Sequence, residues 1–258
     1  MAAARPIGDA PEPSRRAVLA VRAGVAAACL VVWEAISQSG LFFGDVVPST
    51  MKILASFWKL ATFDGFWTHL AVTAGEVVAS VAIGSVAGVI CGIAIGAEPF
   101  LRRAYEPILH YLSPTPRIIL FPVMIMWFGI GPESKVALGA LSAFFPAALS
   151  TSAGMLLIDQ ALIRVGRSFR ATRWQMATKI YLPAMRAPVL NGVRLGFGLA
   201  IIGVLLAETK LSNKGLGFLV MQFYSRFDMP TLYALLIVLF AMAGIFNALI
   251  GAMARERR

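Results

Sequence analysis

The chain has 258 residues, of which 59% are hydrophobic and only 14% are charged. Soluble domains of this size usually contain about 45–50% apolar and about 25% charged residues, so the composition excludes a soluble or disordered protein and indicates several membrane spans. The formal net charge is nevertheless +10, which is typical either of a nucleic-acid binder or of a membrane protein with cationic loops on one side.

Six apolar stretches are long enough to cross a hydrocarbon core of about 30 Å, which takes roughly 20 helical residues. A backbone in lipid must satisfy its own polar groups, and the stretches lack the alternation of barrel strands, so we predict an all-α protein with six transmembrane helices. The predicted spans are residues 17–38, 69–97, 107–128, 135–157, 189–208 and 231–253. Prolines at Pro107, Pro114, Pro116 and Pro122 predict that the third helix is kinked or interrupted.

Basic residues divide unevenly between the two sides of such a chain. With the N-terminus inside, sixteen fall on the cytoplasmic side and six on the outer side, so the positive-inside rule predicts cytoplasmic termini. Basic residues spread along membrane edges also argue against nucleic-acid binding. We predict a disordered N-terminus over 1–16, a transmembrane domain over 17–253 and a short cytoplasmic tail over 254–258.

The second predicted span carries glycines four residues apart, at Gly84, Gly88, Gly92 and Gly96. Residues at this spacing lie nearly one above another on a helix and form a ridge of small residues. In lipid, such a ridge lets another backbone approach closely. The spacing therefore predicts a helix-packing surface, and it leaves open whether the partner helix belongs to the same chain or to another copy.

Ionisable residues within or near spans are candidate functional residues, because burying a charge costs several kcal/mol unless it is paired or wetted. They are Glu34, Glu76 and Arg117. The alternatives are an interfacial position for Glu34, snorkelling for Arg117 and a structural hydrogen bond for Glu76. Enzymatic motifs such as a phosphate loop or H-E-x-x-H are missing, and the two histidines lack metal-ligand spacing, so no catalytic or metal-binding residue is predicted.

The segment 159–188, between the fourth and fifth spans, is the longest predicted cytoplasmic loop and is helical in pattern up to Pro183. Its arginines are three residues apart and wrap about half of a helix surface, with aromatic side chains among them. These are Arg164, Arg167, Arg170 and Arg173. The pattern suits a docking element for a cytoplasmic partner, and by composition alone it suits equally a helix lying on anionic lipid head groups.

This segment resembles the cytoplasmic loop of the permease subunits of bacterial ABC importers, whose pattern is E-A-A, three residues, Gly, nine residues and Ile-x-Leu-Pro. Ile180, Leu182 and Pro183 match the end of the pattern. Arg170 stands where the pattern has its glycine, and Arg164-Val165-Gly166 stands where it has E-A-A. Because Arg170 lacks the backbone freedom of glycine, the resemblance does not fix the turn between the two short helices of this loop.

Other stretches resemble the nitrate, sulfonate and taurine branch of these permeases. They include Trp127-Phe128-Gly129-Ile130-Gly131, Phe144-Phe145-Pro146, Ala171-Thr172-Arg173-Trp174-Gln175, Ala207-Glu208 and Gly215-Leu216-Gly217. The resemblance implies a permease subunit of an ATP-driven importer in the bacterial inner (plasma) membrane, for a small solute such as a sulfonate, taurine or a nitrate-like anion. An ion-coupled secondary transporter or channel subunit is the alternative, and it would need no ATPase.

The resemblance also implies the partners and excludes enzymatic activity in this chain, which would bind no cofactor because ATP binds to a separate subunit. The expected partners are a second permease copy in a homodimer, two cytoplasmic ATPase subunits, a periplasmic or lipid-anchored binding protein and the lipid bilayer.

Three groups of residues are the candidates for function. Those expected to couple to the ATPase are Gly166, Arg167, Arg170, Ala171, Thr172, Arg173, Trp174 and Pro183. Those expected in the translocation path are Arg117, as a counter-charge for an anion, and Glu76. Those expected in an outer gate or a contact with the binding protein are Glu208, Gly215 and Gly217.

Overall fold

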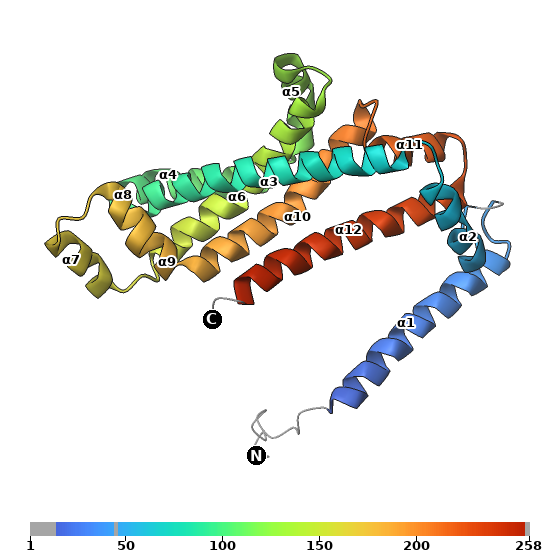
Figure 1. The fold of residues 1–258 in the computed structure, drawn as a ribbon, viewed down its shortest axis with the longest axis horizontal. Helices are drawn as coiled ribbons and strands as arrows, with labels where there is room; N and C mark the ends of the chain where they lie inside the picture. The colour runs from blue at the N-terminus through green and yellow to red at the C-terminus, as the bar shows by residue number, and fades with distance from the viewer. Residues whose placement is uncertain (1–13, 44–45, 256–258) are drawn as a thin grey trace, which may run out of the picture.

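A computed structural model of the chain describes residues 14–43 and 46–255, and every regular element in that part is helical (Figure 1). The elements in chain order are α1 (Arg15–Gln38), α2 (Thr50–Ala61), α3 (Phe66–Ala97), α4 (Pro99–Leu112), a 3₁₀ turn (Arg117–Leu120), α5 (Phe121–Phe128), α6 (Pro132–Met155), α7 (Gln160–Ser168), α8 (Arg173–Met176), a π-helical turn (Ala177–Tyr181), α9 (Leu182–Ala184), α10 (Arg186–Lys210), α11 (Leu216–Ser225) and α12 (Met229–Arg255).

The prediction of an all-α membrane protein is confirmed. Within the described ranges five helices are long and apolar enough to cross a membrane, namely α1, α3, α6, α10 and α12. The sixth crossing is the pair α4 and α5, if this bent pair is one span. Helix α1 begins at Arg15, so residues 15 and 16 of the segment 1–16 that we predicted to be disordered are helical. Residues 1–13 lie outside the described part of the chain.

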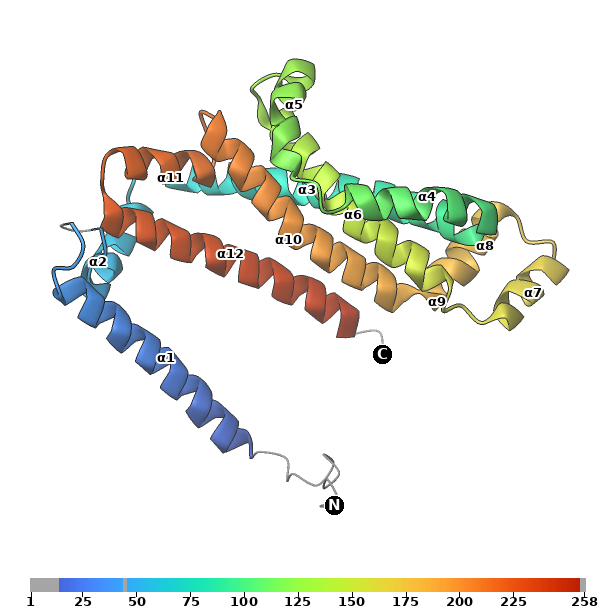
Figure 2. The same ribbon diagram turned by 180° about the vertical axis from the view of Figure 1, so that it is seen from behind.

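Helix α6 is the central helix, with α3 on one side and α10 on another (Figures 1 and 2). The glycine ridge of α3 lies against α6 over its whole length: a Cβ added at Gly88 would be 2.5 Å from the carbonyl oxygen of Phe144. Glycines of α10 approach α6 in the same way, and a Cβ added at Gly196 would be 2.9 Å from the carbonyl oxygen of Ala143. The partner of both ridges is therefore a helix of the same chain.

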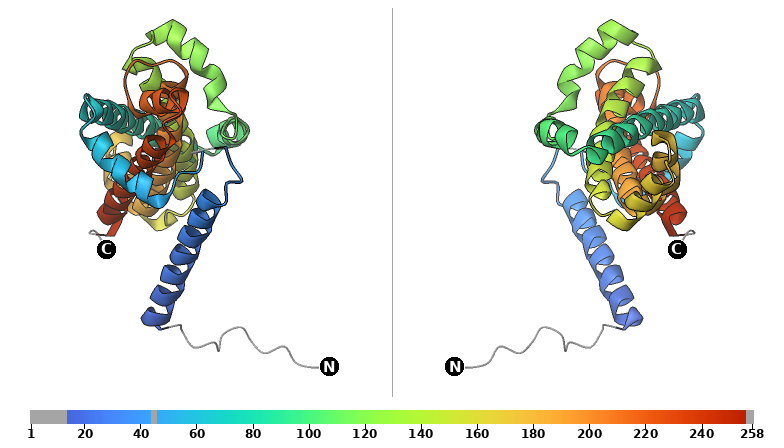
Figure 3. Two further views of the ribbon diagram at one scale, coloured as in Figure 1. Left: turned by 90° about the vertical axis from the view of Figure 1, so that its right-hand side faces the viewer. Right: turned by 90° about the vertical axis from the view of Figure 1, so that its left-hand side faces the viewer.

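The third predicted span is broken into α4 and α5, which are bent by 90°. Pro114 and Pro116 lie in the break and have no N–H to donate, so the helix cannot continue through them. Helix α4 lies beside α3 and α6, whereas α5 protrudes from the bundle (Figures 1 and 3). The interruption that the prolines predicted is thus present, and it turns the chain sideways.

Helix α1 leans away from the bundle and has no buried residue (Figure 2). Its attachment is near its C-terminal end, where the indole N–H of Trp33 donates to the carbonyl oxygen of Pro48 at 3.0 Å. The Glu34 carboxylate accepts hydrogen bonds from the backbone N–H and the hydroxyl of Thr50, the first residue of α2, at 3.1 and 2.9 Å. An anion at a helix N-terminus is favourable, so Glu34 holds the start of α2.

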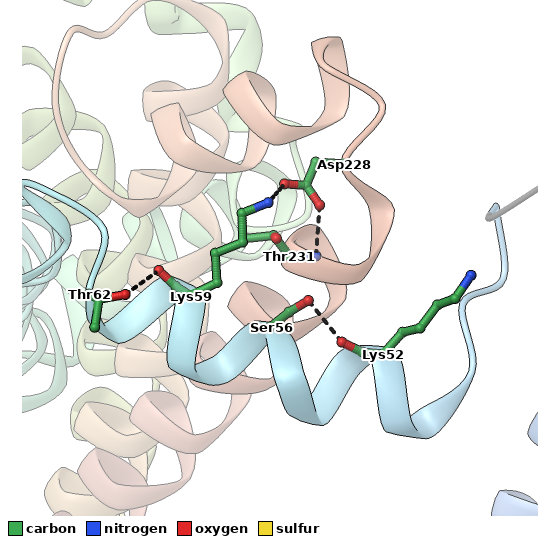
Figure 4. Close-up of polar contacts among 6 residues, drawn as sticks. All are labelled: Lys52, Ser56, Lys59, Thr62, Asp228 and Thr231. Atoms are coloured by element: carbon green, nitrogen blue, oxygen red, sulfur yellow. Dashed lines mark hydrogen bonds and ion pairs between the residues drawn. The ribbon is translucent and has the colours of Figure 1, made fainter.

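Helix α2 is held against α12 and α11. One face of α2 buries Ile53 and Leu60 in the cluster formed with these helices. At its end, Lys59 pairs with Asp228, which directly precedes α12, at 2.5 Å (Figure 4). The Asp228 carboxylate also accepts from the backbone N–H of Thr231 and so caps α12. Burial raises the pKa of Asp228, but the hydrogen bonds from Lys59 and Thr231 outweigh it and hold that pKa below its ordinary value.

Candidate functional site

The segment between α6 and α10 contains the short helices α7, α8 and α9 at one end of the bundle, which we call the α7 end (Figure 1). Helix α7 ends in a Schellman motif, in which the N–H of Ala171 donates to the carbonyl oxygen of Gly166 at 3.0 Å and that of Arg170 to Arg167 at 2.9 Å. Arg170 occupies the left-handed position of this motif, with φ of 51°. Arg170 therefore adopts the backbone conformation that usually requires glycine, and the turn forms without one.

Helix α8 begins immediately after this turn with a capping box. Its N-cap, Thr172, accepts from the backbone N–H of Gln175, whose side chain in return accepts from the N–H of Thr172. Gly166 is buried, and a Cβ there would be 2.5 Å from the sulfur of Met176. Helices α7 and α8 are therefore folded against each other in a fixed way, although neither is long enough to be stable alone.

The outer surface of this segment is basic and aromatic. Phe169 is 82% exposed and Trp174 is 77% exposed. The arginines Arg167, Arg170 and Arg173 are exposed as well. Pro183, which is also predicted to couple to the ATPase, lies just after the π-helical turn. Because proline has no N–H to donate, it interrupts the regular α-helical hydrogen bonding there, which helps to explain the π-helical turn. The structure brings these side chains together on one protruding unit with exposed cations and rings.

At the opposite end of the bundle, the α11 end, a buried carboxylate holds the turn between α10 and α11. Glu208 is only 1% exposed. Its carboxylate accepts hydrogen bonds from the Thr73 hydroxyl at 2.7 Å and the backbone N–H of Gly217 at 2.6 Å. The Thr73 oxygen accepts in turn from the N–H of Leu216 at 2.7 Å. Helices α3, α10 and α11 are thus joined through one side chain.

His69 extends this network. Its Nδ1 accepts from the backbone N–H of Gly215 at 2.9 Å, and its ring stacks on Phe218 with the centroids 5.6 Å apart. Gly215 has φ of 101°, and a Cβ there would overlap the Glu208 carboxylate, so glycine is required at this position. Glu208, Gly215 and Gly217 are all buried within this chain, and they support the turn while its exposed residues, such as Lys214, form its surface.

Two further ionisable side chains are buried next to this network. Glu76 is 5% exposed and interacts electrostatically with Glu208, and its Oε2 has no hydrogen-bond partner in the described part of the chain. Lys135 is 2% exposed and donates to the carbonyl oxygens of Ile130 and Gly131 at 2.6 and 3.0 Å. The sequence gives no sign that Lys135 is buried, because only the fold shows that the turn before α6 closes over its side chain.

Arg117 lies at the bend of the broken span. Its guanidinium donates to the carbonyl oxygen of Ser113 and lies over the ring of Phe145, 5.0 Å from the centroid. The side chain is half-buried, and its Nε has no hydrogen-bond partner among the described residues. Arg117 thus connects the bend to α6. Glu76, the other residue expected in the translocation path, is more buried than Arg117 and lies between helices of this chain.

This architecture is that of a polytopic membrane transport subunit, with a protruding basic and aromatic unit at one end and a buried polar network at the other. The family described as binding-protein-dependent transport system inner membrane component matches residues 84–256. The taurine transport system permease protein TauC of Escherichia coli (strain K12) is 32% identical over 212 residues, which cover 80% of this chain and 76% of that protein.

The putative aliphatic sulfonates transport permease protein SsuC of Bacillus subtilis (strain 168) is 29% identical over 218 residues, which cover 84% of this chain and 79% of that protein. Among solved structures, the MetNI methionine ABC transporter in an inward-facing conformation matches with a TM-score of 0.60. The match has 18% sequence identity and covers 80% of this chain and 96% of that one, so it concerns the fold alone.

The chain therefore belongs to the family of binding-protein-dependent transport system inner membrane components. It is a multi-pass inner-membrane permease subunit of an ABC importer of the taurine, sulfonate and nitrate branch, and not an enzyme, since the ATPase of these systems is a separate subunit. Importers of this family work with ATPase and binding-protein partners. The alternative of an ion-coupled secondary transporter or channel is excluded.

Proposed function

We propose that the segment from α7 to α9 docks the ATPase subunit and transmits its movement to the spans. The observation that supports this most directly is the protruding α7–α8 unit, which exposes Phe169, Trp174 and three arginines around a turn fixed by a Schellman motif and a capping box. A rigid unit with aromatic and arginine side chains has the composition of interface hot spots. In this arrangement the α7 end is cytoplasmic and so are both termini, as the distribution of basic residues predicts.

Movement of this segment would reach the opposite end of the molecule through α10. Helix α10 begins directly after α9, at Arg186, and ends at Lys210, next to the turn that Glu208 holds. A helix of this length, packed through glycines on α6, moves as a rigid element. Closure of the ATPase would then tilt α6 and α10 together and change the position of the α10–α11 turn, where an outer gate or a contact with the binding protein is expected.

For the solute, we propose a small organic anion of the sulfonate type. The relatives that match over most of this chain are named for taurine and for aliphatic sulfonates. The solute would pass between this chain and a second copy of it, with Arg117 as a positive group near the bend of the broken span. A homodimer of permeases with two ATPase subunits is the expected assembly, and the mass of the purified complex tests it.

The test of docking compares two charge reversals. Arg170→Glu places a negative charge on the α7–α8 unit, and Arg226→Glu makes the same change at an exposed position of the α11 end. A tagged permease is purified from membranes that contain the whole transporter, and the retained ATPase subunit is quantified relative to the permease. We expect a several-fold loss of ATPase for Arg170→Glu and none for Arg226→Glu.

A second variant guards against an effect on folding alone. Trp174→Ala removes an exposed ring and leaves the capping box of α8 in place. Each variant is first checked for normal insertion and a monodisperse elution profile. Full retention of the ATPase by both Arg170→Glu and Trp174→Ala would contradict the proposal.

A further inference from the structure

Helix α4 has two different exposed faces. Tyr105 and Ile108 are 51% and 49% exposed and give one face an apolar surface that suits lipid. Arg103 and His110 are exposed on the other side, next to the half-buried Glu106. At about 100° per residue, His110 lies roughly 160° around the helix from Ile108 and less than one turn above it. The two faces therefore meet different surroundings at the same depth.

The polar face borders a shallow depression that is open over most of its extent, which we call the groove. The groove is lined by Arg102, Arg103, Glu106, Pro107, His110 and Tyr111, all of which belong to α4. No other element of the described chain lines it, and Figure 2 shows α4 along the surface of the bundle. The groove therefore opens away from α3 and α6.

The charges of the groove are not balanced within the helix. Arg102 pairs with Glu106 at 4.0 Å, one turn away, so the carboxylate offsets this arginine. Arg103 makes no ion pair with any residue in the described ranges, and His110 adds two ring nitrogens further along the helix. Pro107 has no N–H to donate to the carbonyl oxygen of Arg103, so that backbone oxygen also needs water or another donor.

The polar side chains of the groove follow each other along α4, the first half of the broken span. His110 lies about 17 Å along the helix axis from the start of α4, at 1.5 Å per residue. Polar side chains within a span are costly against lipid tails, so such residues usually face a water-filled cavity. In the described part of the chain, α4 is covered on the side of Leu109, which packs against α3 and α6.

We propose that this groove is a wet wall of the solute passage and binds the oxyanion group of the solute, a sulfonate or carboxylate, between Arg103 and His110. This site adds to Arg117, which lies beyond the break, and it rests on the proposed transport of an organic anion. A guanidinium donates two parallel hydrogen bonds to such a group, and the imidazole and the Tyr111 hydroxyl supply further donors. The phosphate of an anionic lipid has the same chemistry, and the experiment separates the two sources.

The experiment uses the whole transporter in nanodiscs, with Cys29 and Cys91 replaced by alanine and one new cysteine in the permease. His110→Cys reports on the groove, and Ile108→Cys is the matched control on the apolar face. Each is labelled with an anionic sulfonatoethyl or a cationic trimethylammonioethyl methanethiosulfonate, and the rate on the permease chain is measured by mass spectrometry. Rates are divided by that of each reagent with a free thiol.

We expect His110→Cys to react with both charged reagents faster than Ile108→Cys, and to prefer the anionic one by about tenfold, the lower end of the enrichment that a charged cleft produces. Adding Arg103→Gln should abolish the preference but leave the reaction itself. Equal, slow labelling of both positions would show that lipid or the second copy covers the groove and would overturn the proposal. A missing anion preference would overturn it as well.

Two further arms decide the source of the anion. Methanesulfonate, added to nanodiscs of neutral phosphatidylcholine, should slow the anionic reagent at His110→Cys. Phosphatidylglycerol in the bilayer should change the rate little. Stronger protection by phosphatidylglycerol than by methanesulfonate would assign the groove to lipid and refute the solute site. Because labelling does not depend on retention of the ATPase, its failure is distinct from a failure of the docking proposal.

Discussion

The packing of α3 on α6 can be tested with one methyl group. A Cβ at Gly88 would lie 2.5 Å from the carbonyl oxygen of Phe144, 2.7 Å from the Cβ of Ala147 and 3.0 Å from the backbone nitrogen of Ala148. Two of these atoms belong to the backbone of α6 and cannot rotate away. The change Gly88→Ala therefore forces the two helices apart at this point.

The expected magnitude follows from two opposing effects. Inserting a methyl group into a packed interior costs about 1–3 kcal/mol. Alanine is favoured over glycine inside a helix by up to about 1 kcal/mol. Gly75→Ala is the matched control, because Gly75 is exposed on the same helix and a Cβ there meets nothing within 4 Å. We expect a net loss of about 1–2 kcal/mol for Gly88→Ala, and no loss or a small gain for Gly75→Ala.

The difference in stability between these variants is measured by unfolding the purified protein in mixed micelles. Circular dichroism follows the unfolding as the mole fraction of sodium dodecyl sulfate is raised. The midpoint for Gly88→Ala should fall below that of the unchanged chain, and that of Gly75→Ala should not. In the double variant with Ala147→Gly, part of the loss should be recovered, because one of the three contacts is removed. Equal midpoints for the two alanine variants would refute the close approach of α3 and α6.

Three other changes test the turns and the ion pair. Glu208→Ala leaves two buried donors unpaired at about 1–3 kcal/mol each, so limited trypsin digestion at the exposed Lys214 should become faster, and an unchanged rate would contradict this role. Arg170→Gly relieves a left-handed residue worth about 1–2 kcal/mol, so the thermal midpoint should rise; a fall would contradict the turn described for α7. The pKa of Asp228 lies below its ordinary value of 3.8, because hydrogen bonds from Lys59 and from α12 outweigh burial. Its contribution to stability is therefore complete above about pH 4 and disappears as the pH falls through the lower folded-state pKa. The stability difference between the unchanged chain and Asp228→Asn, at most about 1 kcal/mol for an exposed pair, should disappear over that acid range, and a constant difference down to pH 2 would contradict the pairing.

The membrane spans could be predicted from the sequence, but which spans pack against each other, and at what angle, could not. The spacing of Gly84, Gly88, Gly92 and Gly96 describes one face of one helix, so it predicts a close contact without naming the partner. The structure supplies α6 as that partner and shows α10 packed on the same helix. The prolines likewise predict an interruption, while the angle of 90° depends on how α5 leaves the bundle.

The candidate site shows the same limit. The arginines of α7 and α8 were found from their spacing and from a resemblance, but the left-handed backbone of Arg170 contradicts the preference of its residue type, and only the surrounding hydrogen bonds explain it. Glu76 was found because a charge in a span is unusual. The burial of Lys135 was missed, because its two carbonyl partners come together only in the folded turn.

The contrast between tightly packed helices and loosely attached ones suggests which parts of this permease move. Glycine contacts on α6 make α3, α6 and α10 one tightly packed body, which resists internal shear because its backbones touch. Helix α1 buries no residue and is attached near one end, and α5 protrudes beyond a 90° break. We expect this three-helix body to carry displacement from the α7–α8 unit to the turn that Glu208 holds, and the change between states to be a tilt of this body against α1 and α5. Crosslinks within the α3–α6 seam should then leave transport intact, whereas crosslinks between α5 and a neighbouring copy should stop it.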